Sequence, residues 1–266
     1  MRLERRGARR SLLRCALDHL GLWLGLAMLG IGCLLWTLVA VLCERLPGEA
    51  RRRLGQRGAM YGFRLYLFLL QCLGIARFEL SALDALAKGP AMILAPNHPG
   101  MLDALMIISR LPRVVCVTKA SLVDSVFMGA GARLAGYIRN DWFLGTSALA
   151  IEALRRGEHV LIFPEGTRTE RFPINAVRGS IGITAQRSAL PIQTLIIEGD
   201  CAFLAKGWGW LKRPDLPMHF SIRLGERIEP PHDARALPAL LEASFARQLA
   251  GTQHSALHRF LVQEDA

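Results

Sequence analysis

The sequence predicts an α/β fold in which helices flank a mixed β-sheet, with an N-terminal helical hairpin in front of it. Three observations indicate this. The chain has 266 residues, 52% of them hydrophobic, a length that allows one large domain or one medium-sized domain with an attached segment. An uncharged apolar run covers residues 20–43, and from Ile75 onward short apolar segments alternate with helical patterns. We therefore divide the chain into an N-terminal anchor, residues 1–76, and an α/β domain, residues 77–266.

The hairpin prediction depends on two apolar stretches. Residues 20–43 could form a helix that crosses the hydrocarbon core, at about 1.5 Å per residue. Residues 59–76 form a second stretch, interrupted only by Arg64 and Gln71. The connector between them, residues 44–58, contains five arginines, and six more precede the first stretch. A signal peptide is not indicated, because the apolar run is too long and no small-residue cleavage site follows it.

The charge distribution decides between the possible topologies. A two-span hairpin would place the arginine-rich connector outside, against the positive-inside rule. A single span would place one basic flank on the wrong side. A hairpin that dips into one leaflet keeps every basic segment at the same surface, so we expect this arrangement, with one true span as the alternative.

The overall composition restricts the class of protein. Charged residues make up only 21%, which with the hydrophobic content excludes a disordered or coiled-coil chain. The formal net charge is +11 and the mean hydropathy is +0.27, a combination that indicates contact with an anionic membrane. A nucleic-acid binder with a large core could have the same composition. The arginine clusters flank apolar helices, however, which favours lipid headgroups over nucleic acid.

The α/β domain is predicted from its alternating elements. The apolar runs predict strands at 91–95, 114–118, 159–163, 192–197 and 219–224. The periodic segments predict helices at 103–111, 147–156, 176–187 and 236–250. In such a fold the functional residues lie in loops at the strand ends.

The loop after the first of these strands contains a histidine and an aspartate. It reads APNHPGMLD, with His98 after the strand, Pro99 suited to a first helical turn, and Asp103 five residues after the histidine. Five residues turn a helix by about 500°, so the two side chains would not share a face of one helix. They can meet if His98 precedes the helix. The carboxylate would then hold one ring nitrogen and leave the other as a base. The alternative is a helix cap beside a surface histidine.

A second loop, residues 163–169, reads FPEGTRT and follows another buried strand. Gly166 permits a tight turn, and Glu165 can accept hydrogen bonds from hydroxyls. The guanidinium of Arg168 can bind a phosphate through two parallel hydrogen bonds. The alternative is a solvated turn that contains a salt bridge.

Together, NHPGMLD and FPEGTRT resemble the glycerolipid acyltransferase family, of the lysophosphatidic acid acyltransferase type. That family has N-H-x-x-x-x-D followed by F-P-E-G-T-R-S/T, and both blocks are intact here at a fitting spacing. The resemblance covers about residues 91–197. Lys119 matches a commonly basic position, Arg178 and Gly179 match the basic-glycine step, and the segment Leu190-Pro191-Ile192 matches the proline block. The hairpin is similar to the membrane anchor of bacterial members.

The resemblance implies transfer of a fatty acyl group from acyl-CoA or acyl-ACP to a hydroxyl of a lysophospholipid-like acceptor, with lysophosphatidic acid as the first expectation. His98 would be the general base and Asp103 would orient it. No metal and no cofactor beyond the thioester cosubstrate is implied. The resemblance also predicts the cytoplasmic face of a bacterial inner membrane, with anionic lipids as partners; a basic surface would equally suit an acidic acyl carrier protein. The residues implied in substrate binding are Glu165, Gly166, Thr167, Arg168, Arg139, Lys119 and Arg178.

One family block departs from the pattern. Members that use glycerol phosphates usually end a G-x-x-F-I-x-R-like segment with an arginine, whereas the matching position here is Asn140 and Arg139 lies one residue earlier. Related enzymes of aryl polyene clusters and of ornithine-lipid synthesis use other acceptors, and NHPGMLD is similar to the aryl polyene type. An aryl polyene lipid, a lyso-ornithine lipid, or a non-catalytic lipid-binding role are therefore the alternatives. A serine hydrolase is not indicated, since neither Ser147 nor Ser180 lies in a G-x-S-x-G elbow.

Overall fold

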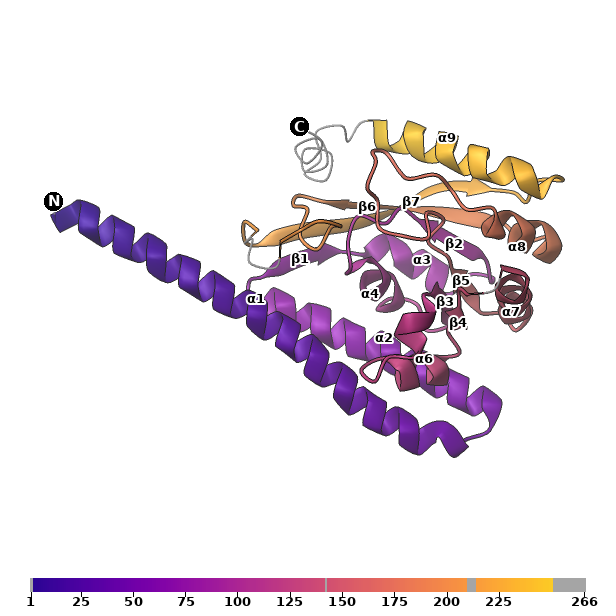
Figure 1. Cartoon of the computed structure of the whole chain (residues 1–266), viewed down its shortest axis with the longest axis horizontal. Coiled ribbons are helices and arrows are strands. Elements are labelled where there is room, and N and C mark those ends of the chain that lie inside the picture. Colours follow the sequence, from indigo (N-terminus) through magenta and orange to yellow (C-terminus); the bar gives the residue numbers. More distant parts are fainter. Residues whose placement is uncertain (1, 142, 210–213, 251–266) are drawn as a thin grey trace.

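A mixed sheet forms the centre of the α/β part of the molecule (Figure 1). The computed structural model describes residues 2–141, 143–209 and 214–250, and in these residues the sheet has seven strands in the order β1-β7-β6-β2-β5-β3-β4. Strands β2 to β6 run parallel to one another, and β1 and β7 run in the opposite direction. The predicted mixed sheet is therefore confirmed. The strands are β1 Ala76–Glu79, β2 Ile93–Pro96, β3 Val114–Thr118, β4 Ile138–Arg139, β5 His159–Leu161, β6 Ile192–Gly199 and β7 Met218–Ile228.

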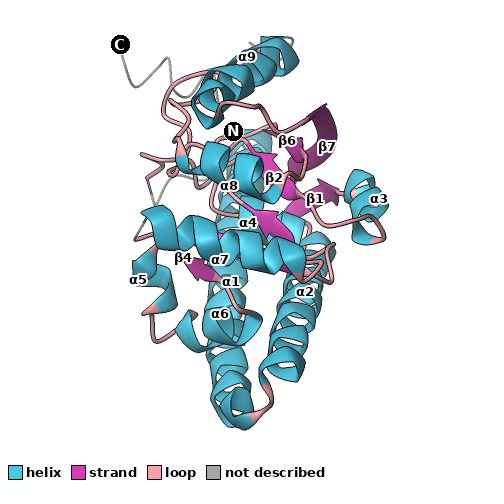
Figure 2. Cartoon of the chain, turned by 90° about the vertical axis from the view of Figure 1, so that its right-hand side faces the viewer, coloured by secondary structure: helices cyan, strands magenta, loops and turns pink. Residues whose placement is uncertain are grey.

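Helices cover both faces of the sheet (Figures 1 and 2). Successive residues of a strand point to opposite faces, so Ile93 belongs to one buried cluster with α7, α8 and α9, and Leu94 belongs to the other with α2 and α4. This two-sided burial explains the continuous apolar runs of the central strands. The helices are α1 Arg2–Leu42, α2 Gly48–Cys72, α3 Asp84–Ala87, α4 Asp103–Ile108, α5 Ala120–Val123, α6 Gly129–Ala135, α7 Phe143–Arg155, α8 Ser180–Ser188 and α9 Leu237–Leu249.

The strands predicted from the sequence are present, with bounds shifted by a few residues, and two further strands were missed. Both missed strands, β1 and β4, lie at the edges of the sheet. β1 alternates buried and exposed side chains, and β4 has only two residues. Short edge strands do not produce the apolar run that identifies a central strand. The predicted helix at 176–187 begins four residues later, at Ser180, and the one at 147–156 begins earlier, at Phe143.

The N-terminal part is a helical hairpin, with α1 and α2 side by side (Figure 1). The expectation of an arginine-rich connector over residues 44–58 is wrong, because α2 already begins at Gly48 and the turn is short. Four of the five connector arginines therefore lie on α2 itself. The helix is amphipathic there: Gly55 and Gln56 are buried, whereas Arg53 and Arg57 are exposed. Among the described residues one helical segment, Ala16–Leu42 of α1, is long and apolar enough to cross a membrane.

Close helix packing holds the hairpin against the α/β part. The indole of Trp36 on α1 lies against Gly58 of α2 and Gly131 of α6, and a methyl group at Gly58 would overlap the ring. A methyl group at Gly55 would overlap the backbone of α6 at its C-terminal end. Three helices can approach this closely only because these positions lack side chains.

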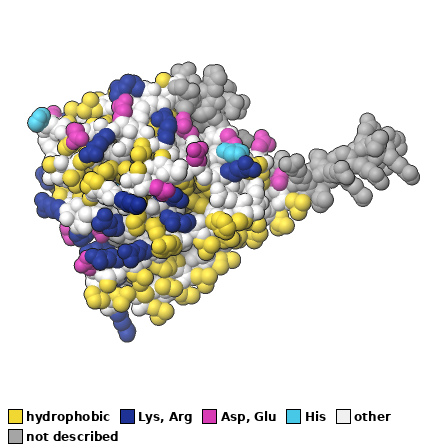
Figure 3. Space-filling model, turned by 180° about the vertical axis from the view of Figure 1, so that it is seen from behind, with side chains coloured by type: hydrophobic (Ala, Val, Ile, Leu, Met, Phe, Trp, Pro, Cys, Tyr) yellow, Lys and Arg dark blue, Asp and Glu magenta, His cyan; other side chains and the backbone are white. Residues whose placement is uncertain are grey.

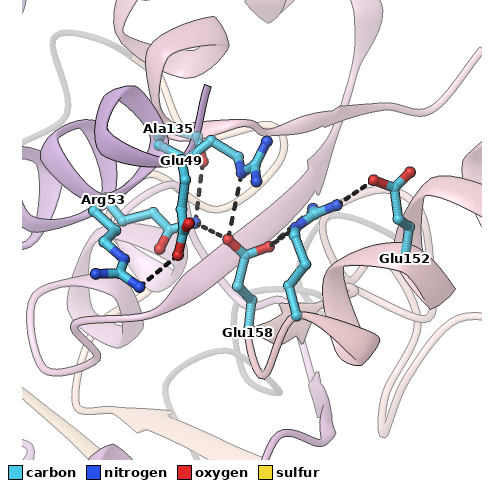
Figure 4. A network of polar contacts seen from close by, with 8 residues as sticks. Glu49, Arg53, Ala135, Glu152 and Glu158 are labelled. Atoms are coloured by element: carbon cyan, nitrogen blue, oxygen red, sulfur yellow. Dashed lines mark hydrogen bonds and ion pairs between the residues drawn. The ribbon is translucent and has the colours of Figure 1, made fainter. Parts of the chain in front are cut away.

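A buried polar network adds a second connection between α2 and the domain (Figure 4). The Gln56 amide nitrogen donates to the Ala135 carbonyl at 3.3 Å and to Glu158 Oε1 at 3.0 Å. Arg156 donates to Glu158 Oε2 at 2.9 Å, and Arg52 Nε lies 3.7 Å from Oε1. Glu158 directly precedes β5, so the network links α2 to the strand that leads into the FPEGTRT loop.

The close approach of α2 and α6 gives a test of this packing. Glycine to alanine in a helix interior usually stabilises by up to about 1 kcal/mol. At Gly55 the added methyl group would meet backbone that cannot rotate away, so we expect Gly55→Ala to destabilise by about 1–3 kcal/mol. Gly62 on the same helix has open space around it and is the matched control, for which Gly62→Ala should be neutral or stabilising. Thermal unfolding in detergent measures both, and equal melting temperatures would contradict the packing.

Candidate active site

The topology brings the two motif loops together. β2 and β5 are adjacent parallel strands, with Leu94 opposite Leu161, so both end at the same edge of the sheet. NHPGMLD follows β2 and FPEGTRT follows β5. The loops after β3, β4 and β6 reach this edge as well, because those strands run in the same direction. This is the edge at which ligands bind in open α/β sheets.

His98 and Asp103 lie in direct contact. His98 Nδ1 is 2.8 Å from Asp103 Oδ2, with the histidine in the loop and the aspartate at the first residue of α4. The backbone N–H of Gly100 donates to the same carboxylate oxygen at 2.8 Å. Asp103 is only 2% exposed. Its pKa is raised by burial, while the hydrogen bonds from His98 and Gly100 and the charge of Arg168 act to lower it.

The contact determines what the histidine ring can do. When the Asp103 carboxylate is ionised it can only accept hydrogen bonds, so Nδ1 of His98 then carries the proton and Nε2 has a free lone pair. Nε2 has no protein partner among the residues that the structure describes. The ring packs on Phe163, with the ring centroids 4.0 Å apart, which restricts its orientation. The arrangement is that of a general base held by a carboxylate. The catalytic roles of His98 and Asp103 remain predictions.

Glu165 is buried between the two loops. It is 2% exposed, and both of its oxygens accept hydrogen bonds from the protein. Oε1 accepts from the His98 backbone N–H at 3.0 Å and from the Thr169 hydroxyl at 2.7 Å, and Oε2 accepts from the Asn175 backbone N–H at 2.8 Å. Burial raises the pKa of Glu165, and these three hydrogen bonds act to lower it. This carboxylate therefore positions the backbone of His98, whereas its predicted contact with an acceptor stays a prediction.

The rest of the FPEGTRT loop forms a tight turn next to Arg178. Gly166 has φ +68°, a conformation that favours glycine, and a methyl group there would overlap the guanidinium of Arg178. Arg178 is exposed, and its backbone N–H donates to the Pro164 carbonyl at 2.9 Å. Thr167, between Gly166 and Arg168, is half-buried. The basic side chain of Arg178 therefore lies directly over the turn that follows Glu165.

Arg168 connects the site to a neighbouring pocket. Its Nη1 donates to the carbonyls of Leu204 and Ala205 at 2.8 and 3.1 Å, which leaves Nε and Nη2 without a protein partner in the described part of the chain. The pocket beside it has a volume of about 290 Å³ and includes Leu26 of α1 in its wall. Its residues are Leu26, Met101, Arg168, Phe203, Leu204, Ala205, Gly207 and Trp208.

Lys119 and Arg139 lie farther along the same edge of the sheet. Lys119 follows β3 and is exposed, and Arg139 ends β4 opposite Thr118. The Arg139 guanidinium binds Asp141 at 2.9 Å and Asp124 at 2.7 Å. The hydrogen bond to Asp141 and the charge of Asp124 raise the pKa of Arg139. Within the described residues no contact joins either basic side chain to His98, so their predicted substrate contacts remain predictions.

Three residues that support the site were not singled out from the sequence. Asn97 joins β2 to β6: its Nδ2 donates to the Ile197 carbonyl at 2.9 Å, and its Oδ1 accepts from the Ile197 backbone N–H at 2.7 Å. Thr169 and Asn175 hold Glu165. Asn97 and Thr169 are polar residues inside the quoted motifs, which is a usable signal, but Asn175 lies outside them. No group of three or more metal-ligating side chains occurs in the described residues.

Comparisons with known proteins identify what the chain is similar to. A family model described as Acyltransferase matches residues 77–198. A lyso-ornithine lipid O-acyltransferase from Pseudomonas aeruginosa is 30% identical over 180 residues, which cover 66% of this chain and 65% of that protein. Residues 77–198 therefore match the Acyltransferase family, and the chain is similar to a lipid O-acyltransferase over a larger part of its length. The resemblance identified from the two motifs is thereby confirmed. The chain spans slightly less than two thirds of the length of that curated relative.

A solved structure extends the similarity to the fold of nearly the whole chain. The 1-acyl-sn-glycerophosphate (LPA) acyltransferase PlsC from Thermotoga maritima superposes with a TM-score of 0.58. The match covers 91% of this chain and 98% of that one at 17% sequence identity. At this identity the likeness shows the fold alone. The matched region includes a large part of the N-terminal hairpin, because residues 77–266 alone make up less than 91% of the chain.

The role of Glu165 as a positioning residue can be tested through Thr169. Thr169 is fully buried, so a change there acts on the site only through its hydrogen bonds. Thr169→Val removes one hydrogen bond to the carboxylate, which should cost about 1.5–3 kcal/mol of stability, and it should lower kcat by displacing His98. Thr184→Val is the matched control, because that buried hydroxyl bonds only within its own helix, to the Ser180 carbonyl.

Thermal unfolding and steady-state kinetics distinguish the two roles of Glu165. If its carboxylate contacted only the acceptor, Thr169→Val would leave the melting temperature unchanged and would alter KM for the acceptor alone. A variant that melts like the Thr184→Val control with a normal kcat would contradict the positioning role.

Proposed function

We propose that this chain transfers a fatty acyl group from a thioester, acyl-CoA or acyl-ACP, to a hydroxyl of a lysolipid at a membrane surface. The observation that carries the proposal is the His98–Asp103 contact at the carboxyl end of β2, with Nε2 free to accept a proton. Two findings support it: the Acyltransferase family model over residues 77–198, and a relative whose name describes O-acylation of a lyso-ornithine lipid.

The geometry supports a direct transfer. Nε2 of His98 takes the proton of the acceptor hydroxyl while its oxygen attacks the thioester carbonyl. Asp103 stabilises the imidazolium that forms, because its Oδ2 accepts the Nδ1 proton at 2.8 Å. Collapse of the tetrahedral intermediate breaks the carbon–sulfur bond, and the departing thiolate takes the proton back from Nε2. The ester and the free thiol are the products, and no acyl-enzyme is formed.

We place the enzyme on the cytoplasmic face of a bacterial inner membrane, with its hairpin in one leaflet. The apolar segment of α1 lies against Ile75 at Gly21 and against α6 at Ala40. At 1.5 Å per residue these two positions are about 28 Å apart along the helix. This nearly equals the hydrocarbon thickness of about 30 Å. An upright α1 would therefore carry the α/β domain through the bilayer. Hydrophobic side chains gather along the lower edge in Figure 3, where α1 and α2 run.

We propose a lyso-ornithine lipid as the acceptor, ahead of lysophosphatidic acid. The relative from Pseudomonas aeruginosa is named a lyso-ornithine lipid O-acyltransferase. Asn140 stands where an arginine would serve a glycerol phosphate, and the neighbouring Arg139 is already neutralised by Asp124 and Asp141. Arg168 remains the cation nearest the catalytic pair and suits a carboxylate as well as a phosphate.

The role of His98 predicts the outcome of a matched pair of variants. His98→Ala removes the base and should lower kcat by about 10²–10⁴-fold, with binding to membranes unchanged. His219 is the control, because its Nδ1 also lies 2.8 Å from an aspartate, Asp200, but on β7 and outside both motifs. His219→Ala should therefore retain activity. Thiol release from an acyl thioester measures both variants, and near-normal turnover by purified His98→Ala would overturn the mechanism.

The acceptor is tested by comparing lyso-ornithine lipid with lysophosphatidic acid of the same acyl chain length. We expect thiol release with lyso-ornithine lipid to exceed that with lysophosphatidic acid by at least about tenfold. Losing one charge-assisted hydrogen bond to the phosphate would have an effect of about this size. Asn140→Arg should reduce the ratio of the two thiol-release rates, because the new guanidinium can bind the phosphate of lysophosphatidic acid. A preference for lysophosphatidic acid in the unaltered enzyme would assign that acceptor instead, and no acceptor-dependent release from any lysolipid would contradict the proposed function.

A further inference from the structure

The loop between α5 and α6 exposes two large apolar side chains in succession. Val126 is 77% exposed and Phe127 is 55% exposed. Single exposed apolar residues are common on protein surfaces, but an adjacent pair at the tip of a loop is the kind of feature that binds another apolar phase. The family signatures do not include these residues, and they take no part in the catalytic geometry described above.

The loop is held in this conformation by its own hydrogen bonds. Ser125 Oγ accepts from the Phe127 backbone N–H at 3.1 Å, and the Ser125 carbonyl accepts from the Gly129 backbone N–H at 2.8 Å. The Thr37 hydroxyl of α1 donates to the Phe127 carbonyl at 3.0 Å. The loop is therefore attached to the membrane-associated helix, and its two apolar side chains point outward from a fixed backbone.

The exposed apolar surface of α1 continues into this loop. Around Thr37, α1 exposes large apolar side chains on the surface that the hairpin would present to lipid; these are Leu34, Leu35, Leu38, Val39, Val41 and Leu42. Val126 and Phe127 lie beside this segment because Thr37 and Phe127 are hydrogen-bonded. A side chain next to a lipid-embedded helix segment lies at a similar depth, so the same bilayer that covers α1 would cover the loop.

The charges near the loop do not oppose contact with lipid. Asp124 is the acidic residue closest to the pair in sequence, and its carboxylate binds Arg139 at 2.7 Å. Lys119, at the start of α5, is exposed and can reach anionic headgroups. The Arg133 side chain on α6 donates to the Val123 carbonyl at 2.9 Å. An acidic protein partner would require unpaired basic groups at the loop tip, where the two apolar residues stand instead.

We propose that Val126 and Phe127 insert into the same leaflet as the hairpin and form a third membrane contact, made by the α/β domain itself. This inference rests on the proposed membrane association of the hairpin. A contact made by the α/β domain, outside α1 and α2, adds a third point of attachment and so restricts how the domain can tilt against the membrane. Because α5 directly follows β3, the loop belongs to the edge of the sheet that carries His98, so the third contact turns this edge toward the lipid.

The inference is tested by crosslinking in vesicles of equal parts phosphatidylethanolamine and phosphatidylglycerol that contain a lipid with an alkyne at its acyl end. Benzoylphenylalanine replaces one residue at a time in the full chain: Phe127 as the test, Leu35 of α1 as the positive control, and Leu240 of α9 as the exposed apolar negative control. We expect lipid crosslinks at positions 127 and 35 and none at 240.

Any other crosslinking result would contradict either the third contact or the membrane association of the hairpin. Crosslinks at 35 without crosslinks at 127 would overturn the third contact and leave the hairpin anchor intact. No crosslinks at either position would overturn the membrane association on which it rests. Crosslinks from 127 to a protein in whole cells, instead of lipid, would assign the loop to a protein partner and overturn the proposal.

A kinetic measurement shows whether the contact orients the site. The double change Val126→Ser with Phe127→Ser should lower acyl transfer to acceptor in vesicles by about tenfold, with transfer to acceptor in detergent micelles unchanged. The matched control is Leu149→Ser with Leu240→Ser, two exposed apolar residues on α7 and α9, which should leave both activities unchanged. An equal loss in vesicles and micelles would indicate a folding defect and would contradict the orienting role.

Discussion

The buried carboxylate of Glu165 joins three stretches of chain, and the candidate active site is built around its hydrogen bonds. It receives hydrogen bonds from the backbone of the His98 loop, from Thr169, and from the segment at Asn175, so three stretches of chain meet at one side chain. Glu165 is only 2% exposed, and burying a carboxylate this deeply costs folding free energy unless its oxygens accept hydrogen bonds. The three donors meet that requirement. In return, the position of the His98 backbone becomes tied to the strand that carries Glu165.

A second buried carboxylate, that of Glu158, joins the N-terminal hairpin to the α/β part of the chain. Glu158 stands at the start of β5, and Gln56 of α2 and Arg156 meet on its carboxylate. Glu165 follows the end of that strand. Two buried glutamates at the two ends of one short strand therefore connect α2 to the histidine loop. All three residues of this strand are buried, so the connection runs through the core of the sheet.

The catalytic loops could be predicted from the sequence because each is short and follows a central strand. His98 and Asp103 are separated by five positions, so local geometry alone limits how they can meet. The helical state of the arginine-rich segment could not be predicted in this way. Gln56 finds its partners 79 and 102 positions away, at Ala135 and Glu158, and no local pattern records such contacts. Likewise, Glu165 in a polar turn reads as solvated until Asn175 is placed beside it.

The net charge of +11 is also less informative than its distribution in the structure. Several arginines that composition would assign to a membrane surface are used inside the protein. Arg156 binds Glu158, Arg168 binds two backbone carbonyls, and Arg139 is paired with two aspartates. Arg57, on the exposed side of α2, has no such partner in the described chain. The case for an anionic surface therefore depends on the arginines that flank the apolar face of the hairpin, because only charges without internal partners remain available to lipid.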